Sequence, residues 1–322
     1  MKNVLVTGGT GFLGANLTRR LLELDQSPFR NVKTIVIPTT EIRTNTALHL
    51  LGLKSNKINL VKGDIRDFEF LRFLFSDHEI DTVFHFGAQS EVRKCQGDAR
   101  LAFDININGT INVLEICRLY SNVEAIAVSS SDKAYGAGEL PYLEETPLNG
   151  KAIYEVSKSC TDLVARAYAN NYEVPVVVTR CTNLYGPGDN NLSRVIPNNI
   201  RKILIGESPM IWKGSEEAIR EFLYVDDAID AYFSLIENIN TVKGNAYNIG
   251  SGERLTIGEL VQKLVDKINP SLEISYPEKD FPEISHQYSD CTKIKNDIDW
   301  NPKIMVDTGL DKTIKFYKEY YK

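Results

Sequence analysis

The sequence lacks several features that would place it in other classes of protein. No apolar run approaches the length of a membrane-spanning helix, and the five cysteines form no CxxC pair and no cluster with histidine. These absences predict a cytoplasmic protein with reduced cysteines, no membrane association and no metal site. The formal net charge of −6 gives no basic excess, so we expect no nucleic-acid partner. The segment MKNVLVTGG has a strand pattern from its start, which leaves no room for a signal peptide.

Low-complexity linkers and internal repeats are also missing, which favours two lobes built on one another over tethered domains. The first half instead contains short β-branched runs separated by segments of helical period. The runs lie at residues 3–8, 32–38, 58–64, 81–88, 123–131 and 174–181, and helices are expected near 11–25, 67–77 and 101–120. This alternation predicts an α/β protein with a doubly wound parallel sheet covered by helices on both faces, a Rossmann fold.

The alternation of strand and helix patterns becomes less regular after residue 183, where longer loops predict a smaller mixed α/β lobe at the C-terminal end. A helix is expected over residues 224–238 and one more strand over 245–250. We therefore assign residues 1–182 and 222–250 to the Rossmann domain, and residues 183–221 and 251–322 to the second lobe.

The first strand ends in TGGTGFLG, which places Gly8, Gly11 and Gly14 at a strand-to-helix turn. Glycines at this turn let the backbone approach a pyrophosphate, and the amides of the helix start at Phe12 and Leu13 favour its negative charge. Because the motif opens a long βαβ series, it predicts a dinucleotide site.

An acid normally follows the second strand and holds the adenosine ribose, but this sequence has Pro38 and Thr39 there. Arg43 is either a partner for a 2′-phosphate or an exposed loop residue, so the choice between NAD and NADP stays open. In GDIRD, after the third strand, Asp64 and Ile65 lie where an adenine would rest, although Asp64 as a capping residue is an equal alternative.

A second constellation is YEVSK, with Tyr154 and Lys158 one helical turn apart. The helix is predicted by apolar residues at helical spacing, namely Ile153, Val156, Cys160, Leu163 and Ala167. An ammonium near a phenol favours the phenolate, which makes Tyr154 a candidate general base for an alcohol proton.

Together these motifs resemble the extended short-chain dehydrogenases/reductases of the nucleotide-sugar epimerase/dehydratase family. The segments TGGTGFLG, GDIRD, HFGAQ, DININGT, YEVSK, RCTNLYGPGD and REFLYVDDAIDAY follow the family's order and spacing. The resemblance implies tightly held NAD(P), a nucleotide-diphosphate sugar in the C-terminal lobe, and a homodimer formed through a helix bundle.

The resemblance also assigns roles to single positions. In HFGAQ it implies cofactor contacts at Phe86, Gly87 and Ala88 and a substrate contact at Gln89. It implies further substrate contacts at Asn183, Arg194 and Arg220. An arginine suits a diphosphate because its planar fork pairs with phosphate oxygens. Taken alone, Asn183 is equally a turn cap and Arg220 equally a surface ion pair.

The segment SSSDKAYG, at the end of the fifth strand, decides between reactions within the family. In the family's 4,6-dehydratases a hydroxyl residue here is followed by an acid and a base, and these positions are Ser131, Asp132 and Lys133. Ser131 would orient the sugar 4-OH and Asp132 would protonate the departing 6-hydroxyl. Lysine departs from the common glutamate and resembles the variant of the CDP-glucose 4,6-dehydratase type.

The implied reaction is a closed redox cycle on an NDP-hexose of the CDP-glucose or UDP-GlcNAc type. Tyr154 takes the 4-OH proton as hydride leaves C4, the ketone acidifies C5–H, and water leaves C6 before hydride returns there. Lys133 acts as the C5 base only when neutral; otherwise it assists a water or stabilises the enolate. The rival hypotheses are an NDP-sugar 4-epimerase, in which Asp132 and Lys133 are bystanders, and a non-enzymatic dinucleotide sensor.

Overall fold

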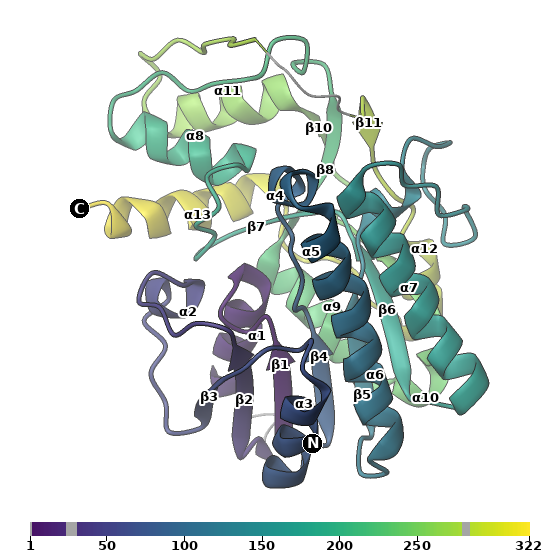
Figure 1. Ribbon diagram of the computed structural model, residues 1–322. Coiled ribbons are helices and arrows are strands. Elements are labelled where there is room, and N and C mark those ends of the chain that lie inside the picture. Colours follow the sequence, from purple (N-terminus) through teal and green to yellow (C-terminus); the bar gives the residue numbers. More distant parts are fainter. Residues whose placement is uncertain (1, 24–30, 279–283) are drawn as a thin grey trace.

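The computed structural model describes residues 2–23, 31–278 and 284–322. A parallel sheet of seven strands forms its centre, in the order β3-β2-β1-β4-β5-β6-β9 (Figure 1). The strands are β1 Asn3–Thr7, β2 Thr34–Thr39, β3 Ile58–Lys62, β4 Thr82–His85, β5 Ala125–Ser129, β6 Val176–Cys181 and β9 Ala246–Ile249. The predicted doubly wound Rossmann sheet is confirmed, and its runs of β-branched residues are buried on both faces.

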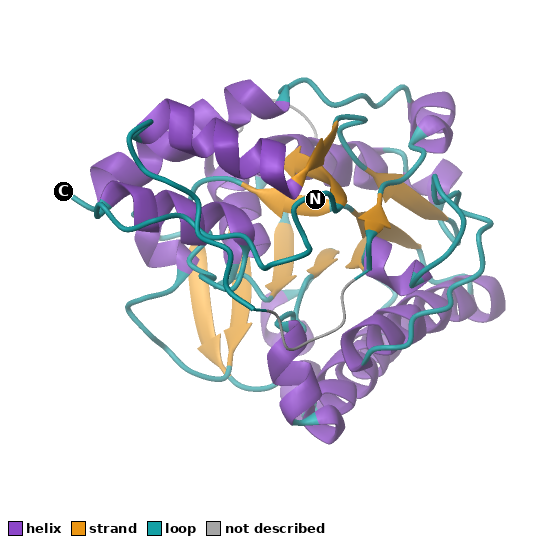
Figure 2. Cartoon of the chain, turned by 90° about the horizontal axis from the view of Figure 1, so that it is seen from above, coloured by secondary structure: helices purple, strands orange, loops and turns teal. Residues whose placement is uncertain are grey.

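Helices cover both faces of this sheet (Figure 2) because successive side chains of a strand point to opposite sides. Val4 and Val6 of β1 belong to the hydrophobic cluster that contains α1 and α9, whereas Leu5 belongs to the cluster that contains α3, α6 and α7. These helices are α1 Phe12–Glu23, α3 Phe68–His78, α6 Gly109–Leu119, α7 Ile153–Tyr172 and α9 Val225–Glu237. The shorter helices of this lobe are α2 Ala47–Leu50, α4 Val92–Gly97, α5 Ala99–Phe103, α10 Ile239–Val242 and α12 Thr292–Ile298.

The second lobe has its own small sheet, in which β8 pairs with β7, β10 and β11. Its elements are β7 Asn183–Tyr185, α8 Val195–Leu204, β8 Ile219–Tyr224, β10 Arg254–Thr256, α11 Ile257–Ile268, β11 His286–Gln287 and α13 Val306–Tyr320. Helices α8, α11 and α13 enclose a separate hydrophobic cluster with this sheet. The lobe lies over the carboxyl ends of the central strands (Figure 1).

Some expected boundaries differ from the structure. The predicted division between the lobes, at residues 221 and 222, falls inside β8. This strand pairs with β7, β10 and β11, so it belongs to the second sheet. In the C-terminal segment, Ile294 and Trp300 pack into the first lobe's core, so the second lobe is not continuous from 251 to 322. The helix expected over 101–120 is interrupted by a π-helical segment, Asp104–Asn108. Helix α1 begins one residue after the expected Gly11, and its expected end at Asp25 lies outside the described residues.

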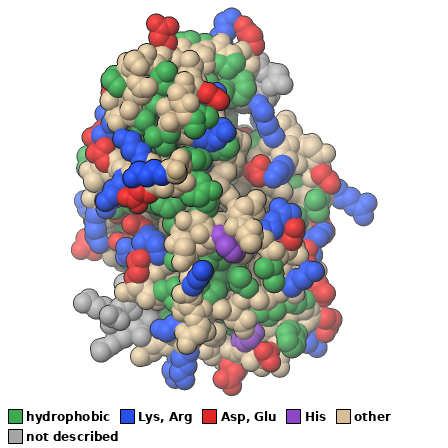
Figure 3. Space-filling model, turned by 90° about the vertical axis from the view of Figure 1, so that its left-hand side faces the viewer, with side chains coloured by type: hydrophobic (Ala, Val, Ile, Leu, Met, Phe, Trp, Pro, Cys, Tyr) green, Lys and Arg blue, Asp and Glu red, His purple; other side chains and the backbone are tan. Residues whose placement is uncertain are grey.

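Among the described residues, no helix is long and apolar enough to cross a membrane. Figure 3 shows acidic and basic side chains interspersed over one face of the molecule. The cytoplasmic location stays a prediction.

Candidate active site

A cavity of about 870 Å³ lies between the two lobes, where the strand order reverses between β1 and β4. Ligands of open α/β sheets bind at this reversal, beyond the carboxyl ends of the strands. Most of the predicted site residues line it, namely Gly8, Gly11, Phe12, Leu13, Gly14, Phe86, Ala88, Ser131, Asp132, Lys133, Tyr154, Lys158, Asn183, Arg194 and Arg220. Residues that are far apart in the sequence therefore converge on one cavity.

The glycine turn fits a pyrophosphate on steric grounds. Gly8 has φ +67°, and a Cβ on it would lie 2.8 Å from the carbonyl carbon of Phe86. A Cβ on Gly14 would lie 2.5 Å from the oxygen of Gly8, so a side chain at either position is excluded. Helix α1 begins at Phe12, and the amides of its first turn have no partner within the helix. These residues would hold the diphosphate of NAD(P).

Four predicted contact residues do not line the cavity. Gly87 donates its amide to the Thr7 hydroxyl at 3.0 Å, and a Cβ on it would lie 3.2 Å from the buried side chain of Ile65. Asp64 accepts hydrogen bonds from the Arg66 guanidinium at 2.7 and 3.0 Å, and Arg66 lowers the pKa of this carboxyl. Gln89 is held through its backbone, by Asn106 at 2.7 and 3.1 Å. Their roles stay predictions.

The end of β2 has no acid, as the sequence indicates. The Thr39 hydroxyl donates to the carbonyl of Glu41 at 2.9 Å, and Arg43 pairs with the exposed Glu41 carboxylate. Because Glu41 accompanies Arg43, neither NAD nor NADP is favoured at this position.

Tyr154 and Lys158 lie on the first two turns of α7, facing the cavity. Burial raises the pKa of the Tyr154 phenol to about 12, while a hydrogen bond with Ser131 and the charge of Arg194 act in the opposite direction. The Lys158 ammonium donates to the Ser129 carbonyl at 2.7 Å, and burial lowers its pKa to about 8. The hydrogen bond with Ser131 and the charge of Arg194 thus both favour the phenolate against the effect of burial, and the roles of Tyr154 and Lys158 stay predictions.

The segment SSSDKAYG forms the end of β5 and a 3₁₀ turn over Asp132–Tyr135. The Ser131 hydroxyl accepts from the Lys133 amide at 3.2 Å and donates to Oδ1 of Asp132 at 3.1 Å. Asp132 is 1% exposed, and its Oδ2 has no hydrogen-bond partner. Lys133 Nζ lies 3.7 Å from Asp132 Oδ1 and donates to Asn183 Oδ1 at 3.3 Å. The turn therefore brings a carboxylate and an ammonium to the same side of the cavity as Tyr154.

The predicted substrate residues of the second lobe are also held in place. Asn183 donates its amide to the Glu221 carbonyl at 3.2 Å. Arg220 is 5% exposed and donates to the carbonyls of Ile284 and Ser285 at 2.6 and 3.0 Å, so it is not a surface residue. Arg194 donates to Asp189 at 3.0 Å, and its guanidinium lies 5.8 Å from the centroid of the Phe12 ring. Arg194 therefore lies next to both Tyr154 and the predicted cofactor site.

Sequence reasoning missed several residues that line the cavity. Arg93 of α4 and Trp212 of the second lobe face each other, with the guanidinium 5.5 Å from the ring centroid. Gln287 of β11 lines the same cavity. Arg93 lies on a six-residue helix, Trp212 in a loop and Gln287 on a two-residue strand, and elements this short have no hydrophobic period that would single them out. One sequence signal could have identified further cavity residues. It is the run of hydroxyl side chains before Ser131, because Ser129 and Ser130 also line the cavity.

The chain is similar to known proteins over almost its whole length. The family model described as GDP-mannose 4,6 dehydratase matches residues 5–313. The human dTDP-D-glucose 4,6-dehydratase is 30% identical over 329 residues, which cover 99% of this chain and 91% of the relative. A dTDP-glucose 4,6-dehydratase structure from Streptomyces venezuelae, solved with NAD bound, is similar with a TM-score of 0.86 at 28% identity, covering 99% and 97% of the two chains.

An epimerase structure is similar as well. The UDP-glucose 4-epimerase of Thermotoga maritima has a TM-score of 0.86 at 25% identity, covering 99% of this chain and 100% of the epimerase. The family match spans almost the whole chain, and the glycine turn, Tyr154 and Lys158 occupy one cavity. The chain therefore belongs to the GDP-mannose 4,6-dehydratase family of extended short-chain dehydrogenases/reductases, and it is an NAD(P)-dependent enzyme.

Proposed function

We propose that the protein is a nucleotide-sugar 4,6-dehydratase that converts an NDP-hexose to the NDP-4-keto-6-deoxy sugar. The observation that carries this proposal is the buried Asp132 carboxyl group, whose Oδ2 has no hydrogen-bond partner and which lines the cavity together with Tyr154. A buried carboxyl oxygen without a hydrogen-bond partner is costly, and an epimerase, which reacts only at C4, has no use for it. A leaving hydroxyl at C6 would give this oxygen a partner.

The first step requires removal of the 4-OH proton. Ser131 and Tyr154 are hydrogen-bonded to each other, so a sugar hydroxyl placed between them contacts both a base and an orienting group. The raised pKa of Tyr154 means that the phenolate needs a nearby positive charge. When bound, the nicotinamide supplies the oxidation at C4 and the reduction at C6, and it adds such a charge in its oxidised form.

The elimination step depends on Asp132 and Lys133. A ketone at C4 acidifies C5–H, and the Lys133 side chain, only partly exposed, approaches the cavity from the same turn as Asp132. Asp132 would give its proton to the 6-hydroxyl as it leaves as water. Lys133 would take the C5 proton when neutral, or stabilise the enolate when charged.

The substrate's nucleobase and sugar are a finer proposal. The Ser-Asp-Lys order favours a CDP-glucose-type substrate, and a UDP-GlcNAc-type substrate is the second candidate. The comparisons name dTDP-glucose for several relatives, so this sugar nucleotide belongs in the same test. Arg220 would pair with the diphosphate of any of them.

The test is turnover by the purified protein of CDP-glucose, UDP-GlcNAc, dTDP-glucose and GDP-mannose, followed by mass spectrometry in deuterated water. Loss of one water from a sugar, with solvent deuterium at C5, is the expected result. An unchanged mass with inverted C4 configuration would instead establish the 4-epimerase, which the similarity to the Thermotoga maritima enzyme keeps as the second candidate. Absence of turnover with all four sugars would refute these four substrate assignments.

The homodimer is a separate proposal that rests on α7. The apolar residues that predict this helix do not form its buried face, because Leu163 is 53% exposed and Ala167 is exposed as well. Polar residues face the sheet instead, including Ser157, Thr161 and Asp162. An exposed apolar stripe on a helix beside α5 and α6 suits packing against a second copy of the chain.

A further inference from the structure

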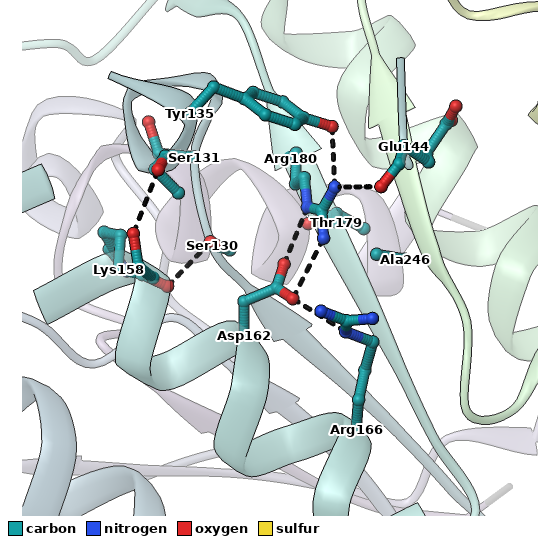
Figure 4. Close-up of polar contacts among 12 residues, drawn as sticks. Ser130, Ser131, Tyr135, Glu144, Lys158, Asp162, Arg166, Thr179, Arg180 and Ala246 are labelled. Carbon is teal, nitrogen blue, oxygen red and sulfur yellow. Dashed lines mark hydrogen bonds and ion pairs between the residues drawn. The ribbon is translucent and has the colours of Figure 1, made fainter. Parts of the chain in front are cut away.

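Behind the cavity, the side chain of Arg180 is buried in the interior (Figure 4). Arg180 belongs to β6, is 1% exposed, and donates through Nε and Nη2 to the two oxygens of Asp162 at 2.7 and 3.0 Å. Its Nη1 donates to the Tyr135 hydroxyl at 2.7 Å and to the Glu144 carbonyl at 2.8 Å. Four hydrogen bonds therefore fix one guanidinium in one orientation.

Two of the three partners of this guanidinium, Asp162 and Tyr135, lie on the elements that carry the predicted catalytic residues. Asp162 lies on α7, one turn after Lys158 and two turns after Tyr154. Tyr135 is the last residue of the 3₁₀ turn that carries Asp132 and Lys133. Arg180 thus connects the helix of the hydride-transfer residues to the turn of the elimination residues.

The Tyr135 side is held by further contacts. Its hydroxyl donates to Asn248 Oδ1 at 2.7 Å, and its ring stacks on Tyr142 with centroids 4.6 Å apart. Asn248 of β9 in turn donates to the carbonyls of Tyr142 and Asp290 at 2.9 and 3.1 Å. The phenol is fully buried, so each of these bonds is made without competing water.

We propose that Arg180 and Tyr135 are positioning residues that set the turn of Asp132 and Lys133 at a fixed distance from Tyr154 and Lys158. This inference rests on the proposed dehydratase function, because only a dehydratase needs both pairs of residues on one substrate. The oxidation at C4 uses α7 and the cofactor, whereas water elimination uses the turn. Loosening the turn therefore slows elimination more than oxidation, since small displacements of a catalytic group cost rate steeply.

The test is Tyr135→Phe, which keeps the ring stacked on Tyr142 and removes only the hydroxyl that bonds Arg180 and Asn248. In single turnovers, elimination is expected to fall by roughly 10- to 100-fold relative to oxidation. The 4-keto intermediate and reduced nicotinamide then accumulate, whereas the wild-type protein passes through them. Arg180→Lys, which keeps the charge and loses the fork, serves as a second variant with the same expectation.

Hydrogen exchange in the turn gives a readout that does not depend on catalysis. The amides of Ala134 and Gly136 bond to the carbonyls of Ser131 and Lys133 within the turn. In Tyr135→Phe they are expected to exchange about 10-fold faster or more, because the variant loses the two buried hydrogen bonds of the Tyr135 hydroxyl. The first turn of α7 is expected to be unchanged.

Arg166→Gln is the matched control, because Arg166 donates to the same Asp162 carboxylate at 2.8 Å from a partly exposed position without contacting the turn. It should change neither the ratio of the two steps nor exchange in the turn. Equal slowing of both steps in Tyr135→Phe, or unchanged exchange at Ala134 and Gly136, would overturn the positioning role. If the wild-type protein dehydrates no sugar, the proposed function fails, and the exchange result still decides whether Arg180 and Tyr135 hold the turn.

Discussion

Replacement of Lys158 by methionine should make the protein more stable while it removes activity. Lys158 is 5% exposed, and burial lowers its pKa from 10.5 to about 8. The folded protein therefore releases this proton near pH 8, whereas the unfolded chain holds it up to its ordinary pKa of 10.5. Below pH 8 the folded state bears the full cost of a buried charge, and this cost disappears as the pH rises to 10.5.

The size of the effect follows from the shift. A difference of roughly 2.5 pKa units corresponds to about 3 kcal/mol of unfolding free energy. Methionine has a similar length and no charge, so Lys158→Met should be about 3 kcal/mol more stable than the wild type near pH 7. The change in packing and the loss of the hydrogen bond to Ser129 add a contribution that does not depend on pH. Between pH 8 and 10.5 this advantage should shrink steadily.

The measurement is urea unfolding of both proteins, freed of nucleotide, at several pH values from 7 to about 10. Taking the difference between the two proteins removes the contributions of titrating groups that do not interact with Lys158. Lys243→Met, at an exposed position, is the control and should show no pH-dependent difference. A difference between Lys158→Met and wild type that stays flat across this range would refute the reasoning, whatever its size.

Three further predictions concern catalysis, cofactor and assembly. Asp132→Asn should lower dehydration by about 100-fold or more while oxidation at C4 persists, seen as reduced nicotinamide that accumulates with substrate; equal loss of both steps would contradict the acid role. Gly8→Ala should abolish NAD(P) binding in calorimetry, because φ +67° and the Phe86 backbone exclude a Cβ; unchanged affinity would contradict the assignment of the turn. Leu163→Glu should convert a dimer to a monomer in light scattering, and an unchanged mass would exclude this face of α7.

The Rossmann half was predictable because its signals are local. Fully buried strands need unbroken β-branched runs, and a close approach to a phosphate needs glycine, so TGGTGFLG and the strand runs indicate the sheet without any tertiary information. The spacing of Tyr154 and Lys158 places them one helical turn apart for the same reason. The boundary between the lobes has no such local signal, and the predicted division between residues 221 and 222 falls inside β8.

The apolar stripe of α7 shows why local pattern fails to assign faces. Its spacing correctly predicted a helix, yet Leu163 faces solvent while Ser157 and Asp162 are buried. The buried Asp162 carboxylate is paired with Arg180, which is 18 residues further on and lies on β6, in addition to Arg166 of the same helix. No periodicity within α7 contains that information.

The sequence by itself indicated the parallel sheet, the glycine turn and the candidate catalytic residue types, since each has a signature within a few residues. Only the tertiary structure decided which side chains share the cavity and which cation approaches Tyr154. The charge of Arg194 favours the phenolate of Tyr154 because the second lobe brings this guanidinium next to the predicted cofactor site. The distance between α7 and the turn of Asp132 and Lys133 also depends on tertiary structure. It is set by the buried guanidinium of Arg180 on β6, which bonds to both elements. Electrostatic forces act through space, and distance in space follows from the fold, not from distance along the chain.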